Sequence, residues 1–331
     1  MAGERVLVAG GAGFIGQHLC RSLLELGHDV VVVDNFCTSD FSGRLALEEL
    51  GVRVIESDVT ATPDGAYDAI FHLASPASPI HYRRLSLETM WANALGSKRL
   101  LDLSGSAGAR FLLASTSEVY GDPLQHPQSE EYRGNVNPVG ERACYDESKR
   151  FAEALTFEYR RVHKANARIA RLFNTYGPGM ALADGRAIPA FTVAAIRNEP
   201  IRIRGSGQQT RSFCYVDDVV EGLIAMGMDP CADGAIFNLG DPGEVSIRQI
   251  AETIRDQAGS SNELVFVPGA SDDPNRRCPD IAKIEAAYGW RPKVDLARGL
   301  RITIDDIAAR LAAEATSPDG APASRPSPMT I

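Results

Sequence analysis

Short apolar runs alternate with longer, helically periodic segments through the first half of the chain. Such runs predict buried strands, and they lie at residues 5–9, 29–33, 52–55, 69–73, 110–114 and 168–172. The intervening segments that repeat apolar residues at helical spacing predict helices at 14–26, 87–104 and 144–163. Because the strands are apolar on both faces, we expect an α/β fold: a Rossmann-type doubly wound parallel sheet that helices cover on both sides.

The pattern changes from about residue 174, where Pro and Gly punctuate the loops. Short strands such as Ile201–Ile203 and helices near 246–257 and 296–312 follow. We expect a smaller α/β C-terminal substrate lobe at the carboxyl edge of the sheet, where such folds bind ligands. The expected boundaries are 1–173 for the first domain, with 211–240 returning to it, 174–210 and 241–314 for the lobe, and 315–331 for a disordered tail rich in Pro, Ala and Ser.

Composition and charge exclude several classes of partner. The 331 residues carry a net charge of −9, which argues against nucleic acid or an anionic membrane as the main partner. We find no charged segment followed by an apolar leader and no apolar run long enough to span a bilayer, so we expect a cytoplasmic protein. The six Cys show no C-x-x-C spacing and no His in a metal-ligand pattern, which predicts free thiols and no metal site.

A glycine-rich turn follows the first predicted strand and opens the first helix. Gly10, Gly13 and Gly16 fit G-x-x-G-x-x-G, a pattern that seats a diphosphate on a helix N-terminus. Asp34 ends the second strand, where a carboxylate binds the adenosine ribose and repels a 2′-phosphate, so we expect NAD rather than NADP. The alternative is an ordinary turn with an exposed Asp. The residues that we expect to contact the cofactor are Gly10, Gly13, Phe14, Ile15, Gly16, Asp34, Asn35, Asp58, Val59, Leu73, Tyr145 and Lys149.

Tyr145 and Lys149 stand four residues apart at the start of a predicted helix, so their side chains share one face. A cation beside a phenol favours the phenolate, and we expect Lys149 to draw the pKa of Tyr145 from about 10 towards neutrality. Tyr145 would then accept the proton of an alcohol. The same spacing also arises by chance. The pair therefore indicates a catalytic site only in combination with the glycine-rich nucleotide motif.

A hydroxyl-rich segment, residues 115–121, follows the predicted strand at 110–114 and reaches the same edge of the sheet. Thr116 would hydrogen-bond the substrate oxygen that Tyr145 deprotonates, and Lys149 would also hold the nicotinamide ribose. The alternative is helix capping and turn chemistry. Together with the glycine turn, these residues complete the pattern of the extended short-chain dehydrogenases.

Over residues 4 to 310 the chain resembles the UDP-glucuronate decarboxylases. The segments that carry the resemblance are 72–79, 115–123, 134–138, 142–150, 170–178, 184–186, 209–216, 272–274 and 279–280. The resemblance implies a carboxy-lyase that oxidises C4 of UDP-glucuronate with NAD, loses CO2 from the 4-keto acid and reduces the product to UDP-xylose. It also implies a homodimer that pairs through two helices of the cofactor domain.

The resemblance further assigns the site residues. The catalytic set that it implies is Thr116, Ser117, Glu118, Tyr145 and Lys149, and the substrate-binding set is Glu118, Asn174, Arg186, Arg211 and Arg277. Ser117 is the discriminating residue, because the related nucleotide-sugar 4,6-dehydratases carry an Asp between the Thr and the Glu. A serine hydrogen-bonds a C6 carboxylate without repelling it. For each Arg, the alternative is a surface ion pair.

Five positions depart from the pattern of the family. This chain has Glu141 where the family usually has Pro, Ser148 where it has Gly, and Gly179 where it has Arg. It has Arg204 where the family usually has Tyr, and Cys278 where it has Lys. Ser148 and Gly179 lie near the site. They leave open an alternative in which the final reduction does not occur and the enzyme releases UDP-4-keto-pentose with NADH. The further alternatives are a nucleotide-sugar 4,6-dehydratase or 4-epimerase, which Ser117 disfavours, and an NAD-sensing binding protein without catalysis, which the retained Tyr145 and Lys149 disfavour.

Overall fold

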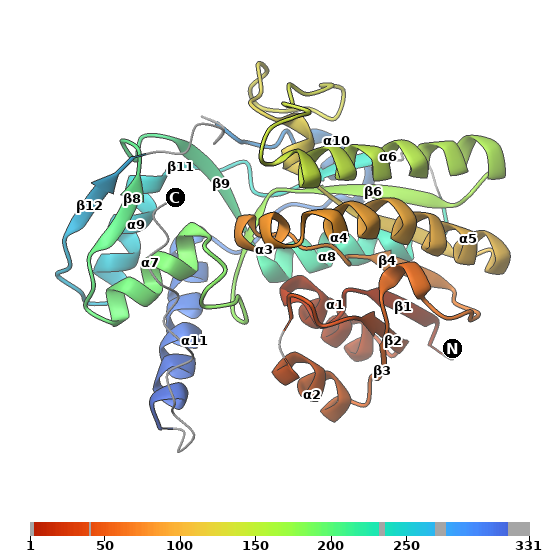
Figure 1. The fold of residues 1–331 in the computed structure, drawn as a ribbon, viewed down its shortest axis with the longest axis horizontal. Helices are drawn as coiled ribbons and strands as arrows, with labels where there is room; N and C mark the ends of the chain where they lie inside the picture. Colours follow the sequence, from red (N-terminus) through yellow and green to blue (C-terminus); the bar gives the residue numbers. More distant parts are fainter. Residues whose placement is uncertain (1–2, 40, 232–235, 269–275, 317–331) are drawn as a thin grey trace.

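The computed structural model describes residues 3–39, 41–231, 236–268 and 276–316 (Figure 1). Most of the predicted tail, and the segment 272–274 of the family resemblance, lie outside these residues. Residues 315 and 316, which we assigned to the tail, instead end the helix α11 (Leu296–Thr316).

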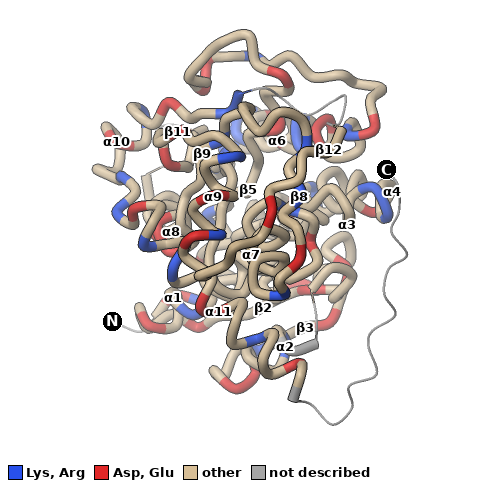
Figure 2. The backbone as a smooth tube through the Cα atoms, turned by 90° about the vertical axis from the view of Figure 1, so that its left-hand side faces the viewer, with Lys and Arg blue, Asp and Glu red and all other residues tan. Residues whose placement is uncertain are grey.

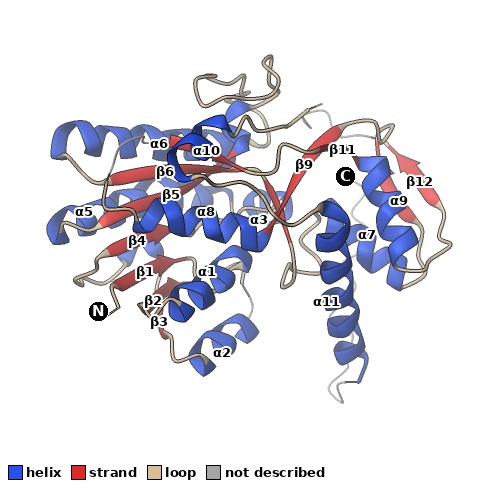
Figure 3. Cartoon of the chain, turned by 180° about the vertical axis from the view of Figure 1, so that it is seen from behind, coloured by secondary structure: helices blue, strands red, loops and turns tan. Residues whose placement is uncertain are grey.

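A seven-stranded parallel sheet forms the centre of the larger part of the molecule (Figures 1 and 3). Its strands, in spatial order, are β10 (Ile236–Leu239), β6 (Ala167–Leu172), β5 (Arg110–Thr116), β4 (Ala69–His72), β1 (Arg5–Ala9), β2 (Asp29–Asp34) and β3 (Arg53–Glu56). All neighbouring pairs are parallel. This order confirms the predicted Rossmann-type fold, and β10 pairs with β6 at one edge.

Helices cover both faces of this sheet because its strands are apolar on both sides. In β1, Val6 and Val8 belong to one buried cluster, whereas Leu7 and Ala9 belong to the other. The helices of the first face are α1 (Phe14–Glu25) and α8 (Val216–Met228). Those of the second face are α5 (Ser97–Ala107) and α6 (Ala143–His163). The shorter elements around the sheet are α2 (Phe41–Glu49), η1 (Val59–Ala61), α3 (Pro79–Arg84), α4 (Ser86–Trp91), η2 (Ala92–Gly96) and η3 (Ser117–Tyr120).

The helix predicted at 87–104 is one helical run with a wider turn inside it. After α4 the chain forms a π turn, η2, and then continues as α5. Asn93 in this turn is fully buried, and its side-chain amide donates to the Thr89 O and to the hydroxyl of Ser148 on α6, both at 3.0 Å. Such turns inside helices are frequent at functional sites. Here the partner on α6 is the residue directly before Lys149.

A smaller α/β lobe lies beyond the carboxyl ends of the central strands (Figure 1), as the sequence predicts. Its two sheets have the orders β11-β9-β7 and β12-β8. The strands are β7 (Asn174–Tyr176), β8 (Ile201–Arg204), β9 (Thr210–Tyr215), β11 (Glu244–Ser246) and β12 (Leu264–Val267). Helices α7 (Ala187–Ile196), α9 (Ile247–Gln257) and α11 pack on one another, whereas α10 (Ala282–Tyr288) packs against β10.

Charged residues of both signs are interspersed along the chain (Figure 2), which accords with a moderate net charge of −9. Among the described residues, no helix combines the length and the apolar character that a membrane crossing requires. All six cysteines are free thiols, as predicted.

Candidate active site

The turn between β1 and α1 forms an open cradle at the carboxyl edge of the sheet. Gly10 has a φ of +82°, and a Cβ there would lie 2.6 Å from the Ala74 N. A Cβ on Gly16 would lie 2.3 Å from the Gly10 O, so both positions require glycine. At Gly13 the nearest neighbour of an added Cβ is 3.4 Å away, and α1 begins without a side-chain cap. The first turn of α1 therefore has room for an anionic diphosphate.

Asp34 lies over this cradle at the end of β2. Its Oδ2 accepts a hydrogen bond from the Ala12 N at 3.0 Å, and its Oδ1 accepts one from the Phe36 N at 2.9 Å. Beside it, the Asn35 amide donates to Oδ2 of Asp58 at 2.9 Å. The carboxylates of Asp34 and Asp58 are thus fixed side by side at the ends of neighbouring strands. This arrangement fits the adenosine half of NAD.

The other residues predicted to contact the cofactor lie along the same edge. Phe14 and Ile15 open α1, Val59 opens η1, and Leu73 follows β4, its N donating to the Ala9 O at 2.8 Å. Each stands directly beyond the carboxyl end of one of the strands β1, β3 and β4. The structure therefore brings the predicted cofactor residues to one row, although their contacts with NAD stay a prediction.

Tyr145 and Thr116 meet at the end of β5. Both side chains are buried, and Thr116 is close enough to lower the pKa of the Tyr145 phenol. The Lys149 Nζ lies 6.0 Å from the centre of the Tyr145 ring and donates to the Ala114 O at 2.8 Å. The ring of Tyr82 on α3 stacks on Tyr145 at 5.1 Å, with an angle of 7° between the rings. The structure thus assembles the predicted triad and adds a second tyrosine that the sequence did not indicate.

The prediction that the pKa of Tyr145 is drawn from about 10 towards neutrality is wrong. Burial raises the pKa of Tyr145 above its ordinary value, and Thr116 opposes this rise only in part. Burial also lowers the pKa of Lys149 to about 7, although the charge of Glu153 acts in the opposite direction. The spacing of Tyr145 and Lys149 indicates that the two side chains are near each other. It does not indicate that both are desolvated by burial, which disfavours the charged form of each.

Ser148, one of the departures from the family pattern, stabilises the start of α6. Its hydroxyl donates to the Tyr145 O at 3.0 Å and accepts from the Asn93 amide at 3.0 Å. Because Ser148 lies between the two catalytic positions, these bonds tie the backbone beside Tyr145 and Lys149 to η2. Ser117, the discriminating residue, is buried at the first position of η3, next to Thr116.

Glu118 lies between two arginines. Its Oε1 accepts a hydrogen bond from Nη1 of Arg277 at 2.6 Å, and its Oε2 accepts one from Nη2 of Arg142. Arg277 is buried, so for this residue the alternative of a surface ion pair is wrong. Burial raises the pKa of the neighbouring Asp146 to about 6, although the charges of Arg142 and Arg277 act to lower it. The pairing puts Arg277 beside Glu118, a predicted catalytic residue, and its contact with the substrate stays a prediction.

Arg142 is a site residue that we did not predict. It is the N-cap of α6, three residues before Tyr145 and seven before Lys149, so helical spacing puts the three on one side of the helix. That spacing is the signal that could have found it. Its second contact is an ion pair of 3.8 Å between its Nε and Oδ2 of Asp146.

The remaining predicted substrate residues come from the smaller lobe. Asn174 on β7 donates to the Ser212 O on β9 at 3.1 Å, and Arg211 on β9 is also buried, so it is not a surface ion pair. Arg186, the N-cap of α7, pairs with Asp184, its Nε lying 2.6 Å from Oδ2. The charge of Arg186 acts to lower the pKa of Tyr145, and its role in substrate binding stays a prediction. The roles of Asn174 and Arg211 in substrate binding stay predictions.

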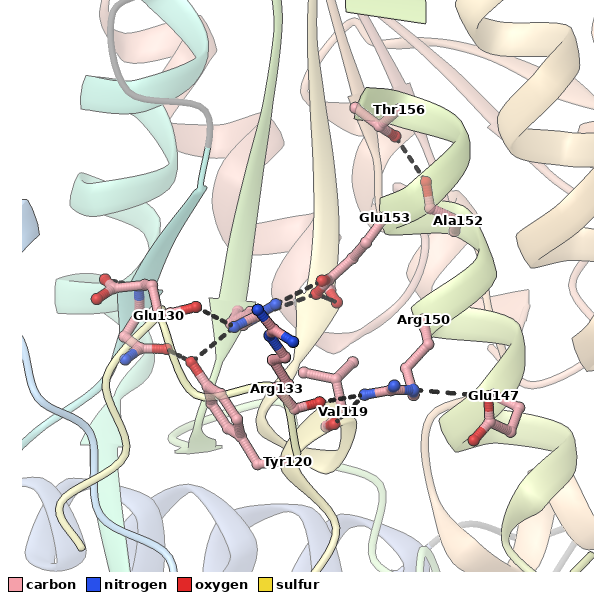
Figure 4. A network of polar contacts seen from close by, with 12 residues as sticks. Val119, Tyr120, Glu130, Arg133, Glu147, Arg150, Ala152, Glu153 and Thr156 are labelled. Atoms are coloured by element: carbon pink, nitrogen blue, oxygen red, sulfur yellow. Dashed lines mark hydrogen bonds and ion pairs between the residues drawn. The ribbon is translucent and has the colours of Figure 1, made fainter. Parts of the chain in front are cut away.

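A buried ion pair between Glu153 and Arg171 holds α6 against the central sheet (Figure 4). Glu153 on α6 accepts from the Ser115 hydroxyl at 2.6 Å and from Nε and Nη2 of Arg171 at 3.0 and 2.7 Å. Arg171 in turn donates to the Tyr120 hydroxyl at 2.9 Å. The network connects α6 to β5 and η3, which with α6 carry the predicted catalytic side chains, and to β6. It is absent from the sequence prediction because its members lie far apart along the chain.

Comparison of the sequence with known proteins identifies the family to which the chain is similar. Residues 6–240 match the NAD dependent epimerase/dehydratase family. The chain is 46% identical to UDP-glucuronic acid decarboxylase 1 of Arabidopsis thaliana over 308 residues, which cover 93% of this chain and 70% of that protein. It is 47% identical to UDP-glucuronic acid decarboxylase 1 of Xenopus tropicalis over 306 residues, 91% of this chain and 71% of that protein.

The solved structures that resemble it have a lower identity. UDP-glucuronic acid 4-epimerase from Bacillus cereus, in complex with UDP-glucuronic acid and NAD, superposes with a TM-score of 0.83 at 26% identity. The match covers 92% of this chain and 99% of that one. The epimerase shares the fold, whereas the sequence is closer to the decarboxylases. This chain belongs to the NAD dependent epimerase/dehydratase family and, within it, to the UDP-glucuronic acid decarboxylases.

Proposed function

We propose that this chain is an enzyme that converts UDP-glucuronate to UDP-xylose and CO2 with NAD as its cofactor. The observation that carries the proposal is its 46% identity with a UDP-glucuronic acid decarboxylase over 93% of its length. Identity with the UDP-glucuronic acid 4-epimerase of the same fold is 26%. The buried serine at position 117 also supports a decarboxylase rather than a dehydratase.

The residues that would hold NAD are the glycines of the 10–16 turn with Asp34 and Asp58, because the turn leaves room for a diphosphate. When bound, NAD supplies the hydride acceptor for C4 of the sugar and the donor that reduces the product. The fit of the turn rests on Gly10 and Gly16, where a Cβ would collide with backbone atoms.

The protein's own groups would move the proton and hold the developing charge. Tyr145 takes the proton of the C4 hydroxyl while Thr116 hydrogen-bonds the same oxygen. The carboxyl carbon is then β to a ketone, and the electrons left by CO2 pass into the C4 enolate. Thr116 and Tyr145 stabilise that oxygen as its charge grows. Arg142 and Arg277 supply positive charge beside the departing carboxylate, and Ser117 hydrogen-bonds it without repulsion.

Mass spectrometry of a reaction mixture tests this function. Purified chain with NAD and UDP-glucuronate should yield CO2 and a nucleotide sugar with the mass of UDP-xylose. A product lighter by two hydrogens, formed with stoichiometric NADH, would mean that the 4-ketone leaves the enzyme. Intact UDP-glucuronate together with turnover of UDP-glucose would refute the decarboxylase assignment.

We also propose that the chain works as a homodimer, with α4, η2 and α6 as its interface. Leu87, Trp91 and Leu95 are each more than half exposed and recur every four residues along α4 and η2. Phe151 on the neighbouring α6 is 53% exposed. Large apolar side chains gathered on one face favour burial against a second copy. In analytical ultracentrifugation Trp91→Glu should shift the wild-type dimer to monomer, and an unchanged sedimentation coefficient would exclude this face.

Two further proposals concern organisation and compartment. The packing of α8 on the sheet and the pairing of β10 with β6 support 211–240 as a segment that returns to the cofactor domain of 1–173, leaving 174–210 and 241–314 to the substrate lobe. Six free thiols support a reducing compartment such as the cytoplasm. Limited proteolysis would test the domain boundaries. Fractionation of cells that express the chain would test the compartment.

A further inference from the structure

Three side chains with metal-ligating atoms meet at one edge of the smaller lobe. They are His126 in the loop after η3, Glu244 at the first position of β11, and Cys278 before α10. One ligand atom from each lies within 4.8 Å of the other two, and Nε2 of His126 is 3.1 Å from Oε2 of Glu244. The spacing of these residues along the chain does not indicate such a cluster, and the sequence predicts no metal site.

The backbones that carry these residues are hydrogen-bonded to one another. The Gln128 N donates to the Cys278 O at 2.9 Å, and the Cys278 N donates to Oε1 of Gln128 at 2.9 Å. On the other side, Ser212 pairs with Glu244 in the β9–β11 ladder and donates its N to the Arg277 O at 3.2 Å. The segment at 276–280 is therefore held between the His126 loop and β11. The cluster is organised before any ligand binds, which reduces the entropy lost on binding.

The side chains are also oriented and charged to receive a cation. The Thr210 hydroxyl donates to Oε1 of Glu244, while Oε2 faces His126.

We propose that His126, Glu244 and Cys278 form a zinc site, with the imidazole, one carboxylate oxygen and the thiolate as its three protein ligands. Imidazole and thiolate select zinc over Mg²⁺ and Ca²⁺, which prefer oxygen. Zn–N and Zn–O bonds of about 2.1 Å and a Zn–S bond of about 2.3 Å put ligand atoms roughly 3.3–3.8 Å apart. The ligand atoms now lie within 4.8 Å of one another, so side-chain rotation on binding would have to bring them closer. Binding releases the Cys278 thiol proton, and water takes the fourth position.

The site would control the position of Arg277, a consequence that rests on the proposed function. Arg277 directly precedes Cys278, and its Nη1 contacts Oε1 of Glu118 beside the reacting centre. A metal on Cys278 fixes the backbone from which Arg277 extends. Zinc binding itself depends on no step of the decarboxylation, so a direct binding measurement distinguishes failure of this proposal from failure of the proposed function.

Cobalt absorption spectroscopy of the full chain, stripped of metal by a chelator and free of any histidine tag, tests the proposal. Co²⁺ should bind one ion per chain and give a thiolate-to-cobalt charge-transfer band that added Zn²⁺ abolishes. Cys278→Ser should lose the band. His126→Ala, a change at an exposed position, should keep the thiolate but weaken cobalt binding at least about tenfold. The control Cys231→Ser removes an exposed thiol outside the cluster and should bind like the wild type.

A variant with the family's usual residue guards against a folding artefact. Cys278→Lys should fold, judged by its circular dichroism, and show no band. Zinc should raise the midpoint of thermal unfolding of the wild type and of Cys231→Ser, but not of Cys278→Lys. Binding of less than one cobalt per chain, or a band that persists in Cys278→Ser, would overturn the proposal.

Discussion

The ion pair between Glu153 and Arg171 gives the sharpest stability prediction. Glu153→Ala removes two hydrogen bonds from the guanidinium and the acceptor of the Ser115 hydroxyl. The two side chains are 9% and 11% exposed, so water does not replace the lost partner. Removing one member of a buried pair costs about 3–5 kcal/mol. Arg171 keeps its bonds to the Tyr120 hydroxyl and the Glu130 O, so we expect a loss at the lower end of this range.

Glu147 provides the matched control on the same helix. Its ion pair with Arg150, at 3.5 Å, has side chains that are 36% and 37% exposed (Figure 4). Such surface pairs contribute about 0–1 kcal/mol, so Glu147→Ala should change the unfolding free energy little. The double variant Glu153→Leu with Arg171→Met should recover most of the loss, because it leaves no buried charge without a partner.

The assay is urea unfolding at one fixed protein concentration, followed by fluorescence and by circular dichroism. The two signals must coincide for a two-state free energy to apply. A fixed concentration keeps any contribution of subunit association constant across the variants. If Glu153→Ala lost no more free energy of unfolding than Glu147→Ala, the reasoning about burial would be refuted.

Three further variants test the reacting centre. Tyr145→Phe should abolish decarboxylation yet still bind UDP-glucuronate in calorimetry, because the ring that stacks on Tyr82 remains; measurable turnover would contradict its role as proton acceptor. Arg142→Gln should lower kcat/KM for UDP-glucuronate about 10–100-fold, the equivalent of one charge-assisted hydrogen bond of roughly 1.5–3 kcal/mol; an unchanged kcat/KM would exclude a contribution to the site. Asp146→Asn should stabilise the fold at neutral pH. Burial raises the pKa of Asp146 from 3.8 to about 6, so the folded wild type binds this proton more tightly, and its stability falls by up to about 3 kcal/mol as the pH rises from about 4 to 6. Unfolding midpoints of variant and wild type should therefore agree below pH 4 and diverge above pH 6, and a constant difference would refute the assignment.

The parts of the site that sequence predicts are those set by local backbone geometry. Gly10 and Gly16 are recognisable because the turn leaves no space for a Cβ, and Asp34 because it ends the strand that follows. The sheet follows in the same way, since continuous apolar runs leave strands few alternatives to a covered parallel sheet. Each of these predictions uses neighbours within one βα unit.

What sequence did not predict depends on contacts between distant segments. Arg142 and Arg277 meet on Glu118 from α6 and from the segment before α10. The Glu153–Arg171 pair joins a helix to the strand after it, and no periodicity marks either residue as charged and buried. The pKa of Tyr145 belongs to the same class, because it depends on how much protein surrounds the phenol rather than on its spacing from Lys149.

The surroundings of Tyr145 predict opposite effects from two neighbouring charges. Asp146 raises its pKa and Arg142 lowers it, while burial sets the larger upward shift. Asp146→Asn should therefore move the acidic limb of the pH profile of kcat/KM, which rises as Tyr145 loses its proton, to lower pH, and Arg142→Gln should move it to higher pH. Both residues lie on the helix that carries Tyr145, so a mere disturbance of that helix would shift both profiles in the same direction. Opposite shifts would identify the charge around the phenol, rather than the Tyr145–Lys149 spacing alone, as what tunes the proton acceptor.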